Sequence, residues 1–597
     1  MKKRNAFIVS NLSAVACLLA VMALCGPASG GDYYTEPEVY QMRPDPAKEM
    51  ALDCIGATGI KARFHPGVIL KVEGFTEKSP AEGRIKAGDI IAGANGVALK
   101  GINPLVALGE ALTAAEATDG RLVFDVKAGE DAEARKVTVM IPVLGKYSER
   151  WPLNCGKSQK IIKAAAEYYA YDPGFREEHF NHSGIPSALA CLFLLSTGDD
   201  KYLPVVQAYF ARFPKDVTGI GEHTWNNGYN GIACAEYYLR TGDKEVLPIL
   251  QHYCDDAKER QNFGCGWSHW GRDINPGYVA SGLVNAAGSQ MLTTLLLGKE
   301  CGVKVDEKTL LGALKFWYRF AGHGTVPYGD HRPEGGLGSN GKDGMSAAAM
   351  RIAMRAEGNT KHYQMALNYL SMSTLTSYPI MILGHGDEGR GDGIWRGMAS
   401  SHMLECKPAD YHAAMNRLHW FHDLSRRPSG GIGMAGCQGF DDTGSGAGVA
   451  LAYTAPLKTL AITGAPRSRH SKKFKLPERI WGNQADLAFL SIENGERFSQ
   501  YGKEEPIEIP LKNFGHAYKD PAADLTRLPR DQILKHIHHG CRTHGPAQKR
   551  DKPHCLSCRQ RPLHQRHPRR SDRCLSRRTA QARPVERGQT LKSTPRK

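Results

Sequence analysis

The chain has 597 residues, enough for several domains, because a single hydrophobic core rarely grows beyond about 250–300 residues. Its net charge of +16 is concentrated at the two ends: residues 541–597 contain 17 lysines and arginines against three acids, and Lys2, Lys3 and Arg4 open the chain. The remainder is close to neutral, so the basic pI does not indicate a nucleic-acid partner, and we expect none.

Residues 1–30 have the features of a secretory signal peptide. A basic start precedes an apolar run from Ala14 to Leu24 and a small-residue exit at Ala28-Ser29-Gly30. The apolar run is shorter than the ~20 residues that a membrane span needs, and no later segment is apolar enough to cross a bilayer. We therefore expect cleavage near Gly30 and an exported protein, periplasmic or extracellular, without a membrane span. Residues 31–49 are interpreted as a linker.

Nine of the 15 cysteines lie between residues 31 and 540, an odd and scattered set that does not form a disulfide framework. Cys191 and Cys234 occupy apolar positions of expected helices, so we expect small core residues there. One or two bridges stay open for an exported protein, because that compartment is oxidising.

Residues 50–145 have a pattern of short strands. Val68–Val72 alternates apolar and polar side chains, and Asn95-Gly96 is a hairpin turn signal. The stretch SPAEGRIKAGDIIAGANG, residues 79–96, resembles the same part of a PDZ domain of the bacterial, circularly permuted type. A helix and two further strands are expected at 104–114, 121–127 and 136–143.

This resemblance implies a small mixed α+β domain that binds the C-terminus of a peptide or protein by strand addition. In such domains the backbone amides of a loop before the first strand hold the terminal carboxylate. The residues expected at this peptide site are Phe64, His65, Gly67, Val68, Ile69 and Leu70. A second interpretation stays open, in which the module docks on the protein's own second domain.

Two near-copies, residues 182–210 and 226–254, organise the next region. A shift of 44 positions places Gly184 on Gly228 and Thr197-Gly198-Asp199 on Thr241-Gly242-Asp243. The apolar spacing between these anchors is helical, so each copy predicts a helix, a Gly-Asp turn and a second helix. Such a pair cannot bury its apolar face alone and needs neighbours stacked beside it.

Further helical segments follow, separated by long glycine-rich loops at 321–344, 384–397 and 428–448. Ten to twelve paired helices over residues 150–465 favour an α/α toroid, and an open α-solenoid is the alternative. The other helices are expected at 278–297, 308–320, 361–376, 410–424 and 447–463.

Over residues 45–465 the chain resembles exported bacterial proteins that combine an N-terminal PDZ domain with a helical domain of unknown function. Residues 466–530 are interpreted as an extension that wraps the toroid. Residues 541–597 lack aromatic side chains and hold few aliphatic ones, so this basic, low-complexity tail cannot fold alone. It is either disordered or an out-of-frame translation.

The loops that precede the inner helices of a toroid converge on one end of its cavity, where we expect any ligand. Aromatic side chains there would stack on sugar rings, and paired carboxylates would act as acid and base or nucleophile. Asp387, Glu388 and Asp392 supply such carboxylates. Capping of helices and turns is the alternative role for them.

A lyase would use other groups, namely an amide or guanidinium that neutralises a uronate carboxylate, with tyrosine or histidine as base and acid. His223, Asn226, Asn227 and Tyr229 supply these types within one expected loop. The alternative is that they hold the repeat together, because part of the cluster recurs one repeat earlier. The residues expected to bind the ligand are Trp225, Asn226, Asn227, Trp267, His269, Trp270, Arg272, His331, Trp395 and Arg396.

The sequence leaves open whether the protein is an enzyme. The leading hypothesis is that the PDZ domain binds a peptide or protein C-terminus while the toroid binds, and as a hydrolase or lyase cleaves, a polysaccharide-like ligand. The alternative is a non-catalytic cell-envelope scaffold that binds proteins through both domains. We expect no metal and no cofactor, and neither a serine nor a zinc protease, because no nucleophile elbow or His-Glu-x-x-His spacing occurs.

Overall fold

The computed structural model describes residues 44–480 with internal gaps, together with two short paired strands, β8 (Arg497–Ser499) and β9 (Gly502–Glu504). The gaps are 181–183, 218–219, 221–222, 263, 270–282, 322–325, 328, 330–341, 378–393 and 438–439. The chain divides into Met1–Glu508, which holds every described residue, and Ile509–Lys597. The expected signal peptide, most of the linker and the basic tail lie outside the described residues.

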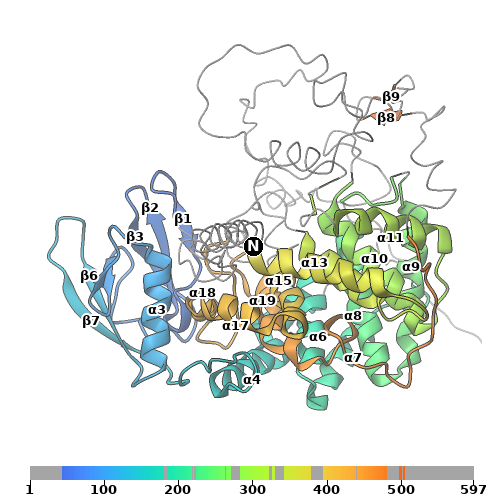
Figure 1. The fold of residues 1–597 in the computed structure, drawn as a ribbon. Helices are drawn as coiled ribbons and strands as arrows, with labels where there is room; N and C mark the ends of the chain where they lie inside the picture. The colour runs from blue at the N-terminus through green and yellow to red at the C-terminus, as the bar shows by residue number, and fades with distance from the viewer. Residues whose placement is uncertain are drawn as a thin grey trace, which may run out of the picture. The chain divides into compact units, whose positions relative to one another are not determined.

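The first described region is an antiparallel sheet (Figure 1, blue). Its strands pair in the order β1-β2-β3-β4-β6-β7, and β5 pairs with β4 outside this path. Alternate residues of β2 and β6 are buried, as the two-residue period of a strand requires. The strands are β1 (Met50–Leu52), β2 (Ile60–His65), β3 (Ile69–Phe75), β4 (Ile90–Ala94), β5 (Val97–Ala98), β6 (Arg121–Lys127) and β7 (Arg135–Met140).

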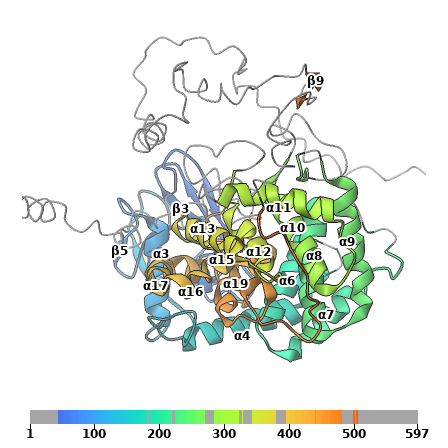
Figure 2. The same ribbon diagram turned by 45° about the vertical axis from the view of Figure 1, so that its right-hand side comes forward.

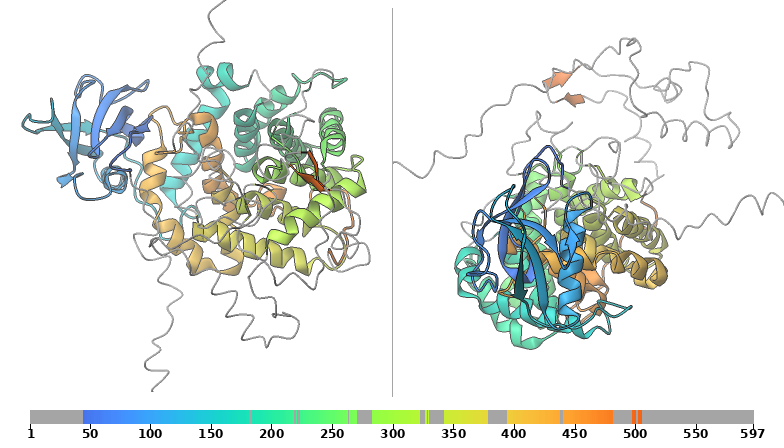
Figure 3. Two further views of the ribbon diagram at one scale, coloured as in Figure 1. Left: turned by 90° about the horizontal axis from the view of Figure 1, so that it is seen from above. Right: turned by 90° about the vertical axis from the view of Figure 1, so that its left-hand side faces the viewer.

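One helix, α3 (Pro104–Glu116), packs on this sheet (Figure 3). It begins where the sequence favours a start, because the Asn103 side chain accepts a hydrogen bond from the Leu105 N–H and Pro104 occupies the first turn. Leu105, Leu108 and Leu112 recur at helical spacing and are buried. The helix therefore closes a core with the strands of the sheet region.

The structure corrects the position of the expected peptide loop. Phe64 and His65 belong to β2, and Ile69 and Leu70 belong to β3, so the segment between them is a hairpin turn and not a loop before the first strand. Gly67 and Val68 have φ of +82° and +62°, which turn the chain within three residues. The loop was misplaced because β1 has only three residues and because Lys61 and Arg63 interrupt the apolar residues of β2.

Fifteen α-helices follow among the described residues. None of the described helices combines the length and apolar character that a bilayer span requires. They are α4 (Gly156–Tyr171), α5 (Pro173–His179), α6 (Ile185–Ser196), α7 (Leu203–Phe210), α8 (Thr224–Thr241), α9 (Leu247–Arg260), α10 (Asn285–Cys301), α11 (Glu307–Ala321), α12 (Asp343–Ala353), α13 (Lys361–Ser377), α15 (Ile394–Ser400), α16 (Met403–Cys406), α17 (Pro408–Asn416), α18 (His419–Ser425) and α19 (Thr443–Thr454).

Six of these helices contact one another in a closed sequence. Helix α6 contacts α8, and the contacts continue through α10, α12, α15 and α19 back to α6. We call these six helices the helix ring. Figure 2 shows them grouped centrally, with α4, α7, α9, α11 and α13 around them. The two sequence copies form the consecutive pairs α6–α7 and α8–α9, as the repeat predicts.

The ring helices run in the same direction. An added Cβ at Gly444, at the start of α19, would meet Pro186 at the start of α6, and one at Gly344 of α12 would meet Trp395 at the start of α15. The segment 458–478, here called the strap, crosses the C-terminal ends of α8, α10 and α12. Its Ala461 and Ile462 N–H groups donate to the Glu236 carboxylate on α8 over 2.8 and 2.9 Å, and its Lys472 N–H donates to the Glu300 carbonyl on α10 over 2.6 Å. The opposite end of the ring, here called the amino end, is therefore formed by helix N-termini.

Close helix packing in the ring depends on small residues. An added Cβ at Gly231 of α8 would lie 2.3 Å from Thr294 of α10, and one at Gly446 of α19 would lie 1.6 Å from the Ile432 carbonyl oxygen. Real Cβ atoms do not approach so closely, so glycine is required at both positions. This need explains the Gly-rich and Ala-rich composition of the ring helices.

Two expected loops are helical instead. The polar run after His223 forms the first turns of α8, and Trp395 and Arg396 lie in α15. Both runs are mostly buried between helices, where backbone groups need internal hydrogen bonds and a helix supplies them. The expected helix at 410–424 also differs, because it is divided into α17 and α18.

Candidate functional site at the amino end of the ring

The amino end of the ring carries many of the polar residues singled out in the sequence. Helix N-termini leave backbone N–H groups without partners within the helix, which gives this end a positive potential. His223 is the N-cap of α8, and its Nδ1 accepts a hydrogen bond from the Asn226 N–H over 3.3 Å. The first turn of α8 is thereby fixed at the point where it meets solvent, since His223 and Asn226 are half-buried.

Trp225 joins a second imidazole to this turn. Its indole Nε1–H donates to Nδ1 of His269 over 2.8 Å, and the two rings are stacked with centroids 5.9 Å apart. His269 is half-buried, whereas Trp225 is almost fully buried. The structure thus brings together three expected ligand residues, Trp225, Asn226 and His269, with His223.

The hydrogen bonds also assign the protons of the two imidazoles. Burial, with help from Arg260 and His269, lowers the pKa of His223, so its ring is neutral at pH 7. A neutral ring whose Nδ1 accepts a hydrogen bond carries its proton on Nε2. The cluster therefore contains imidazole N–H groups, a type of donor that suits hydroxyl and carboxylate oxygens. It does not favour His223 as the base that a lyase would need.

A buried ion pair supports the cluster from behind. Asp256 and Arg260, one turn apart on α9, form a salt bridge with almost no exposure. The Arg260 Nη1 donates to the Thr224 hydroxyl over 2.6 Å, and the Asn227 side-chain amide donates to Asp256 Oδ2 over 2.8 Å. Both residues at the start of α8 are thereby tied to α9, which makes the amino end rigid at this position.

Tyr229 is fully buried and spans the ring. Its hydroxyl accepts a hydrogen bond from Nε1 of Trp395 over 3.0 Å, which connects α8 to α15. At the next residue of α8, the Tyr209 hydroxyl donates to Asn230 Oδ1 over 2.5 Å. These contacts make Tyr229 and Trp395 part of the ring interior in the described structure.

Asp343, at the start of α12, also has a structural role among the described residues. Asp343 accepts hydrogen bonds from the Val326 N–H over 2.6 Å and from the Ser373 hydroxyl over 2.8 Å. The side-chain amide of Asn285, at the start of α10, donates to the carbonyls of Pro327 and Gly329 over 2.9 and 3.0 Å. Asp256 and Asp343 are therefore ill placed to serve as a catalytic carboxylate pair.

The remaining expected residues divide into two groups. The first group, Trp267 and Arg396, is buried. The Trp267 indole donates to the Ala257 carbonyl over 2.8 Å and stacks on Trp317. The others lie outside the described residues, namely Trp270, Arg272, His331, Asp387, Glu388 and Asp392.

Asp256, Arg260 and Thr224 were missed by the sequence reasoning. A signal was present: shifting Asp256 and Arg260 back by 44 positions gives Arg212 and Asp216, both exposed. These positions lie just beyond the two copies, where the second repeat has a buried pair that the first lacks.

In the part of the chain that the structure describes, no group of three or more histidine, cysteine, aspartate or glutamate side chains is arranged to hold a metal ion. A family model described as a domain of unknown function (DUF6288) matches residues 158–464 of the chain. No curated protein matches the chain. The matched residues begin within α4 and end at the strap, so they include the whole helix ring.

Proposed function

The chain belongs to the DUF6288 family, whose description names no activity, and we propose that it is an exported protein that binds a carbohydrate-like ligand at the amino end of an α/α toroid. The toroid is supported by the closed contacts of the six ring helices and their common direction. Export rests on the signal-peptide pattern of residues 1–30.

The cluster of His223, Trp225, Asn226 and His269 is the observation that carries this proposal. It combines imidazole N–H donors, an amide and an indole at the positive end of helix α8, held by the buried Asp256–Arg260 pair. Hydroxyl and carboxylate oxygens of a sugar acid accept such hydrogen bonds, and aromatic edges contact sugar rings. The assigned protons favour binding over proton abstraction, so cleavage would depend on the expected carboxylates Asp387, Glu388 and Asp392.

Binding is tested by titrating the purified full chain with a panel of neutral and uronate-containing polysaccharides in a calorimeter. We expect His223→Gln and His269→Gln to weaken binding at least tenfold, because a flexible amide does not hold its N–H where the rigid imidazole holds it. The matched control is His179→Gln, at the same position of the preceding repeat, which should bind as the wild type does. Assays for new reducing ends and for unsaturated products separate a hydrolase and a lyase from a binder.

The scaffold alternative makes the opposite prediction. If no polysaccharide binds, and a protein partner is retained by the wild type and the two variants alike, the ligand proposal is wrong and the scaffold is favoured. If binding occurs but both variants keep the wild-type affinity, the site lies elsewhere on the chain.

A further inference from the structure

The surface formed by α3 and the turn at Gly56–Gly59 is covered by the protein's own helical part. Helix α18 lies along α3 and also contacts this turn. Gly109 of α3 permits a close approach, because an added Cβ there would lie 2.3 Å from the Trp420 carbonyl oxygen. At Gly56, with φ of +52°, an added Cβ would lie 2.7 Å from the Asp423 carbonyl oxygen. Two glycines therefore permit backbone contact across the junction, as we call the contact between the sheet region and the helical part.

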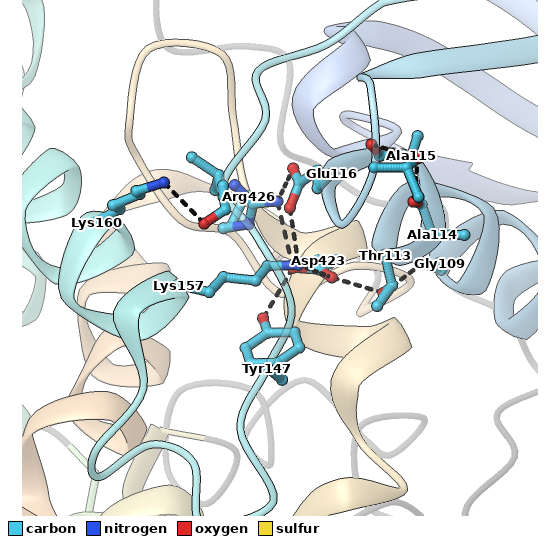
Figure 4. A network of polar contacts seen from close by, with 12 residues as sticks. Gly109, Thr113, Ala114, Ala115, Glu116, Tyr147, Lys157, Lys160, Asp423 and Arg426 are labelled. Carbon is cyan, nitrogen blue, oxygen red and sulfur yellow. Dashed lines mark hydrogen bonds and ion pairs between the residues drawn. The ribbon is translucent and has the colours of Figure 1, made fainter.

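A buried ionic network joins the same elements (Figure 4). Lys157 Nζ lies 2.9 Å from Glu116 Oε2 at the end of α3 and 2.6 Å from Asp423 Oδ2 on α18, and all three side chains are fully buried. Arg426 pairs with the same two carboxylates. Two positive and two negative charges thus neutralise one another between the sheet region and the helical part.

Hydroxyl groups complete the partners of Asp423. The Thr113 hydroxyl of α3 donates to Oδ2 over 2.6 Å, and the Tyr147 hydroxyl donates to Oδ1 over 2.8 Å. Burial alone would raise the pKa of Asp423, but Arg426 and Lys157 outweigh it and hold the pKa below its ordinary value. A buried charge network with this many partners is costly to break, because each lost partner leaves a charge without compensation.

A second carboxylate reaches the turn that precedes β2. Asp441, immediately before the N-cap residue of α19, accepts a hydrogen bond from the Asp53 N–H over 3.2 Å. Its other oxygen accepts the Met434 N–H over 2.9 Å and pairs with Arg427. The edge of β2 is closed as well, because β1 pairs with it from Met50 opposite Phe64 to Leu52 opposite Ala62.

We propose that the sheet region is a docking module whose partner is the helical part of the same chain. In this arrangement the turn before β2 holds the Asp441 carboxylate at the position where a PDZ-type module would hold the terminal carboxylate of a foreign peptide. Since Asp441 leads directly into α19, docking also fixes one of the helix N-termini at the amino end of the ring. This inference does not depend on which ligand the ring binds.

The rate at which the Cys54 thiol is alkylated measures whether the sheet region is docked on the helical part. Cys54 is fully buried beside the turn, and Arg427 and Asp441 of the helical part are among the charges that act on it. We would alkylate the folded full chain with iodoacetamide and follow each cysteine by peptide mass spectrometry. The exposed Cys406 is the reference for fast labelling, and the buried Cys191 of α6 is the reference for an intact ring.

Two variants test the contact from opposite sides. Gly109→Ala places a methyl group against Trp420, and Asp441→Asn removes the captured carboxylate without altering the sheet region. We expect each to raise the rate of Cys54 labelling at least tenfold while Cys191 stays protected. The control is Gly74→Ala, where an added Cβ meets nothing within 4 Å and labelling should not change. The proposal is overturned if wild-type Cys54 reacts as fast as Cys406, or if both variants leave its rate unchanged.

Discussion

The guanidinium of Arg260 donates to the Thr224 hydroxyl over 2.6 Å while it pairs with the Asp256 carboxylate, so one buried cation links the end of α9 to the start of α8. Asp256 in turn accepts the side-chain amide of Asn227. The position of the His223–Trp225 turn therefore depends on a pair of charges that has almost no contact with solvent.

We predict that Asp256→Asn destabilises the protein by about 3–5 kcal/mol, because the substitution leaves the Arg260 charge buried without its partner. Urea unfolding monitored by circular dichroism measures this loss. The control is Asp216→Asn, at the exposed position 44 residues before Arg260, and it should leave the midpoint unchanged. An equal effect of both substitutions would contradict the structural role of the pair.

The hydrogen bond between Trp395 and Tyr229 gives a second prediction. Removing either partner leaves the other buried polar group short of one hydrogen bond, which costs about 1–3 kcal/mol, whereas removing both costs less than the sum. Trp395→Phe, Tyr229→Phe and the double variant form a cycle whose coupling energy urea unfolding can measure. Strict additivity would show that the two helices do not interact through this contact.

Much of the helical architecture could be predicted from the sequence because its signals are local. The spacing that places Gly198 on Gly242 reflects two helices that end in the left-handed conformation, and both glycines have positive φ in the structure. Asn103-Pro104 likewise marks the start of α3. Each of these features depends on a few neighbouring residues, so the sequence pattern is sufficient.

The junction could not be predicted, because it joins residues far apart in the chain. Asp53 and Asp441 are separated by 388 positions, and Glu116 and Lys157 gain partners in α18 and just beyond it that no sequence spacing indicates. Trp395 was expected to contact a ligand, and its burial arises only when α15 takes its place in the ring between α12 and α19, across from α8. Tertiary packing decided the role of these residues.

Acid should weaken the junction through His422. The imidazole of His422 is fully buried against Trp151 and Tyr453, and neither of its nitrogens has a hydrogen-bond partner among the described atoms. Burial lowers the pKa of His422 to about 3, although Asp423 opposes the shift. The unfolded chain takes up the proton near pH 6.5 and the folded chain does not, so stability falls as pH decreases from about 6.5 towards 3.

The slope expected from His422 is about 1.4 kcal/mol per pH unit within that window. His422→Phe should remove this slope and cost little at pH 7.5, because the aromatic packing is kept and no hydrogen bond is lost. Urea midpoints between pH 4.5 and 7.5 provide the measurement, with the partly exposed His65→Gln as the control. A wild-type acid slope retained in His422→Phe would assign the acid sensitivity to other groups.

Glu236 should produce the opposite slope at the other end of the ring. Burial raises the pKa of Glu236 to about 7, although two strap N–H groups favour its charged form. An unfolded glutamate loses its proton near pH 4.5, so between pH 4.5 and 7 the folded state binds more protons than the unfolded state. The contribution of Glu236 to stability therefore decreases as pH rises through this window.

Glu236→Gln tests this sign directly. The variant cannot ionise, so its unfolding free energy should decrease less than that of the wild type between pH 4.5 and 7, by about 1.4 kcal/mol per pH unit. Measured in the His422→Phe background, the slope of Glu236 is separated from the opposing slope of His422. The exposed Glu245→Gln serves as the control and should follow its parent at every pH. Identical slopes with and without Glu236 would mean that its carboxylate stays charged when it holds the strap.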